Sequence, residues 1–126
     1  MRYLSKNTLL SYIFILLLSG CTGHNTRQKI ADATADKNGF QSHIVKAGQF
    51  WIRTYQKIKS PELPYVFYIE GDGFAFKNKY TISEDPTPKT AMMLRLAAMD
   101  YRSNIVYMAR PCQYLEEGAM EHCDSA

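Results

Sequence analysis

The sequence predicts an α/β fold in which a β-hairpin is followed by a strand, a helix and a second strand. Residues 40–45 and 50–55 are rich in β-forming side chains and are separated by a turn-like segment. Residues 65–69 and 104–109 are continuous apolar runs, which are typical of strands covered on both faces. A helical pattern lies between those two runs. Two strands joined by a helix form a βαβ unit, in which the strands are parallel and the crossover is right-handed.

The opening hairpin is predicted from alternation and from a turn signal. Residues 46–49, Lys-Ala-Gly-Gln, form the expected turn between the two strands. In the second strand, Trp51, Arg53 and Tyr55 fall on one face and the residues between them on the other. His43 lies in the first strand, where we interpret it as an ordinary strand residue. A proline-punctuated connection over residues 60–64 then leads to the third strand.

The helix of the βαβ unit is predicted to begin at Thr87 and to run to about Asp100. Thr87 can serve as the N-cap, with Pro88 at the first helical position. Apolar side chains occupy nearly the whole circumference of this helix, so it should be covered on more than one side. These side chains are Ala91, Met92, Met93, Leu94, Leu96, Ala97, Ala98 and Met99.

The first twenty residues have the pattern of a secretory signal. Arg2 and Lys6 precede an apolar run over residues 9–18, and Ser19 and Gly20 follow it. The run is too short to span a bilayer as a helix, which takes about twenty apolar residues. Leu18-Ser19-Gly20-Cys21 resembles a bacterial lipobox, and this resemblance implies that residues 1–20 are removed and Cys21 carries lipid. The alternative is a plain signal peptide with an incidental cysteine.

A lipidated Cys21 implies a place in the bacterial cell envelope. The lipid bilayer would then be the partner of the acylated cysteine, with the folded part facing the periplasm. Thr22 follows Cys21, and because no aspartate stands there we favour the outer membrane over the inner one. Residues 21–38 are polar and small, with Ile30 as the one sizeable apolar side chain, and they predict a disordered tether. His24 belongs to this tether.

The length and the net charge of the chain limit the functions that it can have. The chain has 126 residues, so removal of 20 leaves 106, about one domain but small for a three-layer α/β enzyme. The net charge is +3, and loss of Arg2 and Lys6 reduces it to about +1. A chain with so small a positive charge has no electrostatic footprint for nucleic acid, so no nucleic-acid partner is expected.

Three motifs in order resemble the start of a bacterial α/β-hydrolase-like family, several of whose members are secreted or are lipoproteins. They are Tyr-Ile-Glu-Gly-Asp-Gly at 68–73, Asp-Pro-Thr-Pro at 85–88 with Leu-Arg-Leu-Ala at 94–97, and Ala-Arg-Pro-Cys-Gln-Tyr at 109–114. The resemblance covers roughly residues 40–124. It implies that the hairpin supplies the first two strands of the hydrolase sheet, residues 65–70 the third and residues 105–109 the fourth. Residues 39–126 would then be a partial, truncated α/β-hydrolase-like domain.

The resemblance also implies a role for the loop after the third strand. In such hydrolases this loop donates a backbone N–H to the oxyanion hole. Gly71, Asp72, Gly73 and Phe74 occupy that position, as a remnant of the loop. A tight strand-to-loop turn is the alternative interpretation. The connection from Gly71 to Thr87 is long, and long structureless loops are often functional.

The rest of the hydrolase apparatus is missing from the sequence. No G-x-S-x-G elbow occurs, and no histidine follows Asp124 and Ser125, the last residues of types that the triad needs. We therefore assign no catalytic residue and expect no hydrolase turnover from this chain alone. No cofactor is expected.

Cys112 and Cys123 remain once Cys21 is assigned to lipid. An exported compartment favours their pairing in a disulfide, and the family resemblance includes both cysteines. A metal site formed by Cys112, His122 and Cys123 is disfavoured, because two of its ligands are adjacent and a fourth is missing. No metal is expected.

Three functional hypotheses follow from the sequence. The first is a membrane-anchored lipoprotein that resembles the front of a serine α/β hydrolase, whose complete members hydrolyse ester or acyl bonds, and that is inactive alone. The second is a small lipid-anchored envelope or interaction protein without catalysis, whose βαβ core either is self-sufficient or dimerises to cover its exposed strand and helix faces. The third is a hydrolase that another polypeptide completes.

Overall fold

The fold is known from a computed structural model, which describes residues 26–120 and 122–123. The expected signal peptide and Cys21 lie outside these residues. In order, the elements are α2 (Thr26–Lys37), β1 (Gln41–Ala47), β2 (Phe50–Ile58), β3 (Val66–Ile69), β4 (Phe76–Asn78), β5 (Thr81–Ile82), α3 (Met92–Met99), β6 (Asn104–Met108) and the 3-10 turn η1 (Glu117–Ala119). None of the helices in this part of the chain is long and apolar enough to cross a bilayer.

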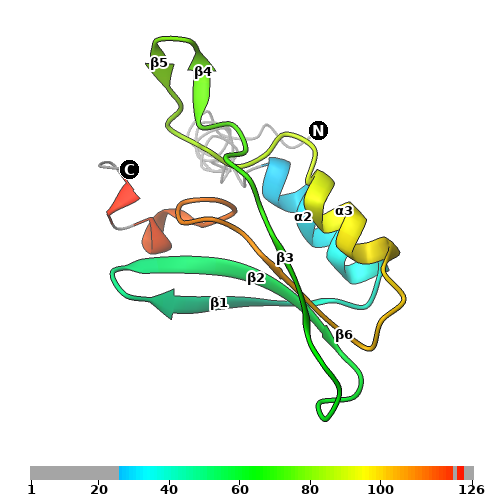
Figure 1. Ribbon diagram of the computed structural model, residues 1–126. Helices are drawn as coiled ribbons and strands as arrows, with labels where there is room; N and C mark the ends of the chain where they lie inside the picture. Colours follow the sequence, from blue (N-terminus) through cyan, green and yellow to red (C-terminus); the bar gives the residue numbers. More distant parts are fainter. Residues whose placement is uncertain (1–25, 121, 124–126) are drawn as a thin grey trace, which may run out of the picture.

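Four strands form the main sheet in the order β1-β2-β6-β3 (Figure 1). The pairs β1–β2 and β2–β6 are antiparallel, whereas β3 and β6 are parallel. The chain reaches β6 from β3 through the short hairpin β4–β5 and helix α3. The α/β class is therefore confirmed, and the hairpin and the parallel pair are both present.

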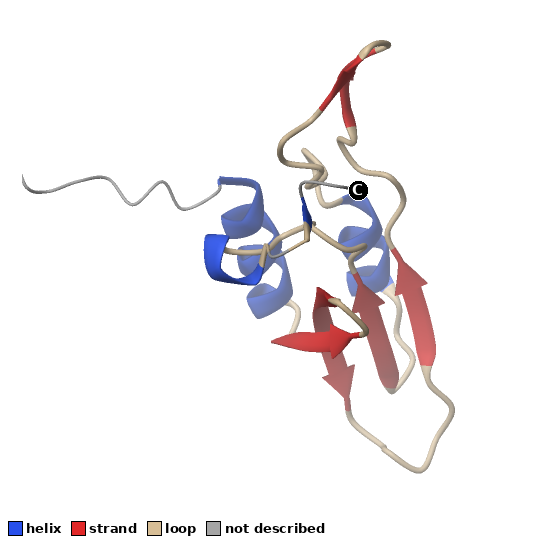
Figure 2. Ribbon diagram, turned by 90° about the vertical axis from the view of Figure 1, so that its left-hand side faces the viewer, coloured by secondary structure: helices blue, strands red, loops and turns tan. Residues whose placement is uncertain are grey.

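Both helices lie side by side on the same side of the sheet (Figures 1 and 2). Beneath them the sheet presents Tyr55 and Ile105 together with Tyr107, and Leu94 and Ala97 of α3 are buried against this face. Burial of such apolar and aromatic surface is the main force that holds the helices on the sheet. The rings of Tyr55 and Tyr107 lie 5.8 Å apart, and those of Tyr107 and Tyr114 6.4 Å apart.

Strand β3 differs from its prediction because it lies at the edge of the sheet and is covered on one face only. Tyr68 points to the helices and donates a hydrogen bond to Asp100, whereas Phe67 and Ile69 are more than half exposed. The prediction of a doubly covered strand was correct for β6, whose side chains at residues 104–107 are buried. An apolar run alone does not distinguish a central strand from an edge strand with an exposed apolar face.

Residues 26–37 form helix α2, so the prediction of a disordered tether is wrong for this segment. The helix buries small side chains, Ala31 and Ala35, which allow it to approach the core closely. Asp32 accepts a hydrogen bond of 2.7 Å from the Tyr55 hydroxyl, which fixes the helix on the sheet. Tertiary contacts thus stabilise a segment whose own apolar content is low.

Helix α3 begins four residues later than predicted, at Met92, with Ala91 in place of Thr87 as its N-cap residue. Thr87 does not cap it, because its hydroxyl oxygen instead accepts the backbone N–H of Tyr114 at 2.9 Å. The predicted end near Asp100 is correct. The helix is covered on one side only, so Met92 and Met99 are exposed and the expected second cover is absent from the described residues.

The connection between Gly71 and Thr87 is not structureless, as the sequence suggested, but contains the hairpin β4–β5. Phe76 pairs with Ile82 and Asn78 with Thr81. The Asn78 side chain accepts the N–H of Tyr80 at 3.0 Å, which closes the turn. Below it, the Ser83 N–H donates to the carbonyl of Ala75 at 2.8 Å. The hairpin projects from the end of the molecule at which β3 and β6 stop (Figure 2).

Candidate functional site

An open hollow of about 470 Å³ lies beyond the carboxyl ends of the parallel strands β3 and β6. In open α/β sheets this is the edge at which ligands bind. Three segments supply most of its lining: the loop after β3, the loop after β6, and the segment that follows the β4–β5 hairpin; residues of β5 and residues after η1 complete it. Its lining residues are Asp72, Ala75, Ile82, Ser83, Glu84, Pro86, Arg110, Pro111, Cys112, Gln113, Met120 and Cys123.

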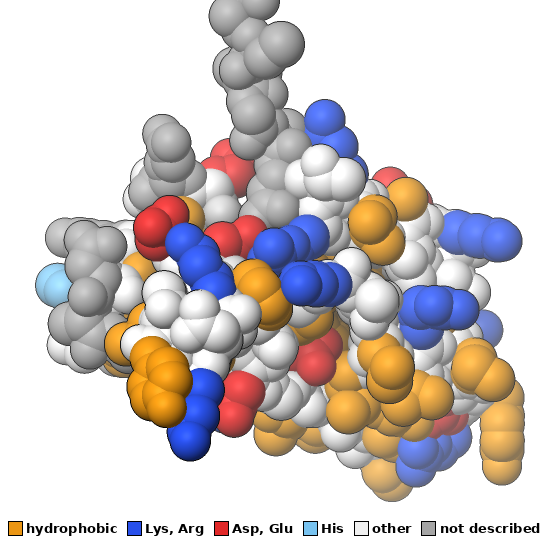
Figure 3. All heavy atoms as spheres, turned by 90° about the horizontal axis from the view of Figure 1, so that it is seen from above, with side chains coloured by type: hydrophobic (Ala, Val, Ile, Leu, Met, Phe, Trp, Pro, Cys, Tyr) orange, Lys and Arg blue, Asp and Glu red, His pale blue; other side chains and the backbone are white. Residues whose placement is uncertain are grey.

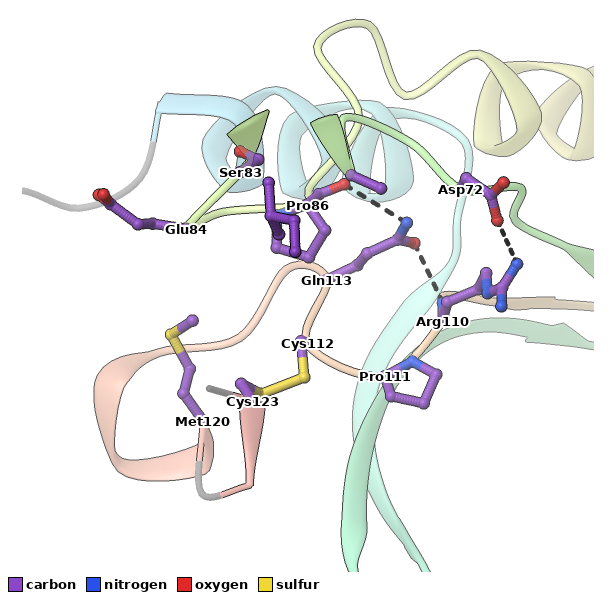
Figure 4. Close-up of a pocket in the computed structure, with 12 residues that line it drawn as sticks. Asp72, Ser83, Glu84, Pro86, Arg110, Pro111, Cys112, Gln113, Met120 and Cys123 are labelled. Carbon is purple, nitrogen blue, oxygen red and sulfur yellow. Dashed lines mark hydrogen bonds and ion pairs between the residues drawn. A yellow bond between two sulfur atoms is a disulfide. The ribbon is translucent and has the colours of Figure 1, made fainter. Parts of the chain in front are cut away.

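The buried side chain of Gln113 joins the three walls of the hollow (Figure 4). Its Nε2 donates to the carbonyl of Gly71 at 3.0 Å and to that of Pro86 at 3.4 Å. Its Oε1 accepts the backbone N–H of Arg110 at 3.1 Å. The side chain is 1% exposed, so these bonds are shielded from water and hold the loops in one arrangement.

Gly73 allows the loop after β3 to approach the other walls. Its φ is +62°, a region that glycine adopts without strain. A Cβ at this position would overlap the carbonyl oxygen of Pro86 and would lie 2.7 Å from Gln113 Nε2. The N–H of the next residue, Phe74, donates to the same Pro86 carbonyl at 2.8 Å. Only glycine fits here without displacing backbone.

The loop after β6 is held in a constrained conformation. Cys112 and Tyr114 have φ values of 68° and 55°, which are uncommon for residues with a side chain. The Arg53 Nε donates to the Tyr114 carbonyl at 3.1 Å, and Thr87 accepts the Tyr114 N–H, so both backbone groups of Tyr114 are bonded. A disulfide joins Cys112 to Cys123, with the two Cα atoms 5.6 Å apart. The surrounding contacts therefore impose a conformation that the sequence does not favour locally.

Below the hollow, three buried tyrosines connect it to the core. The Tyr107 hydroxyl donates to Glu70 Oε2 at 2.9 Å, at the point where β3 ends. Burial raises the pKa of Tyr107, and the charge of Glu70 adds to this effect. Burial also raises the pKa values of Tyr55 and Tyr114. The three hydroxyls thus stay protonated at neutral pH and act as structural groups.

Several polar side chains at the rim of the hollow are already bonded to other protein groups. Arg110 forms an ion pair with Asp72 (Figure 4). The Ser83 hydroxyl donates to the Asp85 carbonyl at 2.8 Å and accepts the Asp85 N–H at 3.3 Å. No histidine is among the described residues that line the hollow. The described part of the site therefore offers hydrogen bonds and apolar surface to a ligand, and no described nucleophile there donates a hydrogen bond to a side-chain base.

The loop assigned to an oxyanion hole lies at the hollow, although two of its four N–H groups are already used. Gly71 donates to Glu70 Oε1 at 3.0 Å, and Phe74 donates to Pro86 as described. Within the described residues, no hydrogen bond engages the N–H of Asp72 or Gly73. Any ligand oxygen bound by this loop would therefore have to use those two donors.

Among residues 26–120 and 122–123, no group of three or more His, Cys, Asp or Glu side chains could hold a metal ion. Two members of the disfavoured Cys112, His122 and Cys123 site are consumed by the disulfide. His43 lies on β1, outside the hollow.

The sequence interpretation missed the organising roles of Gln113, Arg53 and Arg27. Each is a polar side chain that bonds backbone carbonyls from distant segments, and such partners follow from the tertiary fold. The one available signal was the position of Arg53 and Gln113 inside otherwise apolar or aromatic stretches. In comparisons with protein-family models, curated proteins and solved structures, nothing matched this chain.

Proposed function

We propose that this chain is a lipid-anchored protein of the bacterial cell envelope whose folded part corresponds to the opening strands of an α/β-hydrolase-type sheet. It binds a ligand in the hollow beyond β3 and β6 and does not turn it over. The proposal rests on one observation about the hollow. It lies at the edge of the sheet where ligands bind in open α/β folds, yet its described lining residues contain no nucleophile paired with a base.

The arrangement of strands supports the hydrolase part of the proposal. The chain supplies an antiparallel pair, β1 and β2, and then the parallel pair β3 and β6, in the order that the resemblance expects. The Gly71 to Phe74 loop lies at the edge where hydrolases place an oxyanion donor. These observations support the proposal that this chain and the α/β hydrolases share the same arrangement of opening strands. The motifs at 68–73 and 109–114 both contribute residues to the walls of the hollow.

The absence of turnover can be tested with a serine-directed fluorophosphonate. We expect no stoichiometric labelling of the purified mature protein, because the Ser83 hydroxyl donates its proton to the backbone carbonyl of Asp85 and not to a histidine or carboxylate. A known serine hydrolase labelled in parallel is the positive control. Stoichiometric labelling of native protein that disappears in Ser83→Ala would contradict the proposal. Labelling that persists in urea would indicate non-specific chemistry.

The anchor is tested separately. Mass spectrometry of the membrane fraction should find acyl chains on Cys21, and Cys21→Ser should move the protein out of that fraction. Separation of inner from outer membranes should place the native protein in the outer one. Thr22→Asp should then shift it towards the inner membrane. An unmodified Cys21 in protein recovered from the membrane would refute the lipid anchor.

A second candidate function, self-association, is favoured by the exposed edge of the sheet. Phe67 and Ile69 on β3 are more than half exposed, and in the described residues no strand pairs with the outer edge of β3. Edge strands with apolar side chains readily pair with another chain. Sedimentation velocity should then detect a dimer that Phe67→Glu disrupts and Tyr101→Glu, at an exposed site off the sheet, does not. A monomer at all concentrations would refute this candidate.

A further inference from the structure

The β4–β5 hairpin carries apolar side chains that are largely exposed, and one of them, Ile82, also lies at the edge of the hollow. Phe76 and Ile82 are cross-strand partners, so they lie together on one face of the hairpin, and both are more than half exposed. Tyr80, in the turn, is 86% exposed. A small projecting element with three exposed apolar side chains is expected to contact another surface.

This end of the molecule also carries an excess of basic side chains. Lys77 and Lys79 belong to the hairpin, which has no acidic residue between 76 and 82. At its base, Lys89 lies 3.9 Å from the centre of the Phe74 ring. Three acidic residues nearby each have a basic partner: Glu84 pairs with Lys77 at 3.3 Å, Asp85 pairs with Arg27, and Asp72 pairs with Arg110. Figure 3, seen from above, shows Lys and Arg side chains beside hydrophobic and acidic ones on this surface.

The first turn of α2 is attached to the base of the same hairpin. The Arg27 guanidinium donates to the carbonyl of Thr87 at 2.9 Å and to that of Asp85 at 3.2 Å. It also lies 4.9 Å from the centre of the Phe74 ring. The chain therefore enters the fold beside the hairpin, at the end away from the β2–β3 connection (Figure 1).

An acylated Cys21 would place a membrane close to this end. Cys21 precedes Thr26 by five residues, and five residues reach at most about 18 Å when fully extended. If Cys21 is acylated, as proposed above, the lipid surface must lie within that reach of the first turn of α2. The hairpin extends outwards from the same place. Tyrosine and phenylalanine beside lysine suit the boundary between headgroups and acyl chains.

We propose that the β4–β5 hairpin docks on the phospholipid surface that holds Cys21. Phe76, Tyr80 and Ile82 enter the headgroup region, while Lys77 and Lys79 contact lipid phosphates. The hairpin then acts as a second attachment point that fixes the orientation of the domain on the membrane. This inference rests on the lipid anchor of the proposed function, and it adds a site that the anchor alone does not require.

The test uses the mature, lipidated protein in vesicles with bromine-labelled acyl chains, which quench tryptophan at the membrane. Trp51 is the single tryptophan, so Trp51→Phe removes all tryptophan fluorescence and any tryptophan added later is the only emitter. Tyr80→Trp then reports on the hairpin. Tyr101→Trp is the matched control, because Tyr101 is 96% exposed and follows α3, at the opposite end of the parallel strands. We expect at least a two-fold quench at position 80 and little at position 101.

Lipid charge tests the role of the lysines. Vesicles of phosphatidylcholine with phosphatidylglycerol should quench Tyr80→Trp more strongly than vesicles of phosphatidylcholine alone. Lys77→Gln with Lys79→Gln should abolish this difference. The double control Lys37→Gln with Lys59→Gln, on exposed lysines away from the hairpin, should retain it. Equal quenching in both lipids would overturn the lysine contacts.

The outcomes separate this proposal from the anchor itself. Protein that carries no lipid on Cys21 and does not sediment with vesicles would refute the proposed function. Protein that is lipidated and sediments, but shows no quenching at position 80 or equal quenching at positions 80 and 101, would refute the hairpin contact alone. Circular dichroism of each variant confirms that the fold is retained.

Discussion

Gly73→Ala should be far more damaging than alanine at other glycines, because it combines two separate costs. The first is conformational: a left-handed backbone costs a residue with a side chain about 1–2 kcal/mol. The second is steric: the new Cβ would overlap the Pro86 carbonyl and approach Gln113 and the Pro88 ring. Overpacking of this kind costs about 1–3 kcal/mol. Together these effects predict a loss of about 2–5 kcal/mol in the free energy of unfolding.

Two other glycines separate the two costs. Gly48 has the same φ of +62° but open space around it, so Gly48→Ala should show the conformational cost alone. Gly71 has neither a positive φ nor a close neighbour, so Gly71→Ala should change stability by less than about 0.5 kcal/mol. Urea unfolding followed by circular dichroism measures all three. Equal losses for Gly73→Ala and Gly48→Ala would refute the steric argument, and with it the close approach of the loops.

Three further predictions concern the core and the loop after β6. Because burial raises the pKa values of the three buried tyrosines, stability should fall as the pH rises above about 10, with their phenolate absorbance appearing only on unfolding. Hydrogen bonds from Arg102 lower the pKa of Asp100, so Asp100→Asn should lower the free energy of unfolding at neutral pH. In urea titrations at falling pH, the difference in this free energy between the variant and the wild type should vanish as acid protonates the Asp100 carboxylate. Reduction of the Cys112–Cys123 disulfide should cost about 3 kcal/mol, measured by unfolding with and without reductant; two free thiols in oxidised native protein would contradict it.

The strands were predictable because their sequence patterns are local. Alternation gave the β1–β2 hairpin, and apolar runs gave β3 and β6 with a helix between them. What no local pattern contains is the order of strands across the sheet. The run at residues 65–69 is as apolar as a central strand, yet β3 is an edge strand because β6 pairs between it and β2. Edge or centre is decided by which other segments compete for each strand's hydrogen bonds.

Helix α2 and the start of α3 were mispredicted for a related reason. The stability of α2 comes from Ala31, Ala35 and the Tyr55–Asp32 hydrogen bond, and small side chains leave little apolar signal in the sequence. Thr87 is a good N-cap by its chemistry, but the orphan N–H of Tyr114 uses its hydroxyl instead. The hydrogen bond to the buried N–H of Tyr114 therefore outweighs the preference of Thr87 for a helix N-cap position.

The hollow, the hairpin and the chain entry share one end of the molecule because parallel strands place their following loops together. The loops after β3 and β6 must emerge at the same edge, and the β4–β5 hairpin grows from one of them. Arg27 then ties the first turn of α2 to that edge through the carbonyls of Asp85 and Thr87. Pro86 lies between these two residues and accepts from Gln113 inside the hollow, so a contact that moves the hairpin also bears on the hollow. A membrane that held both Cys21 and the hairpin, as proposed above, would consequently lie close to the hollow.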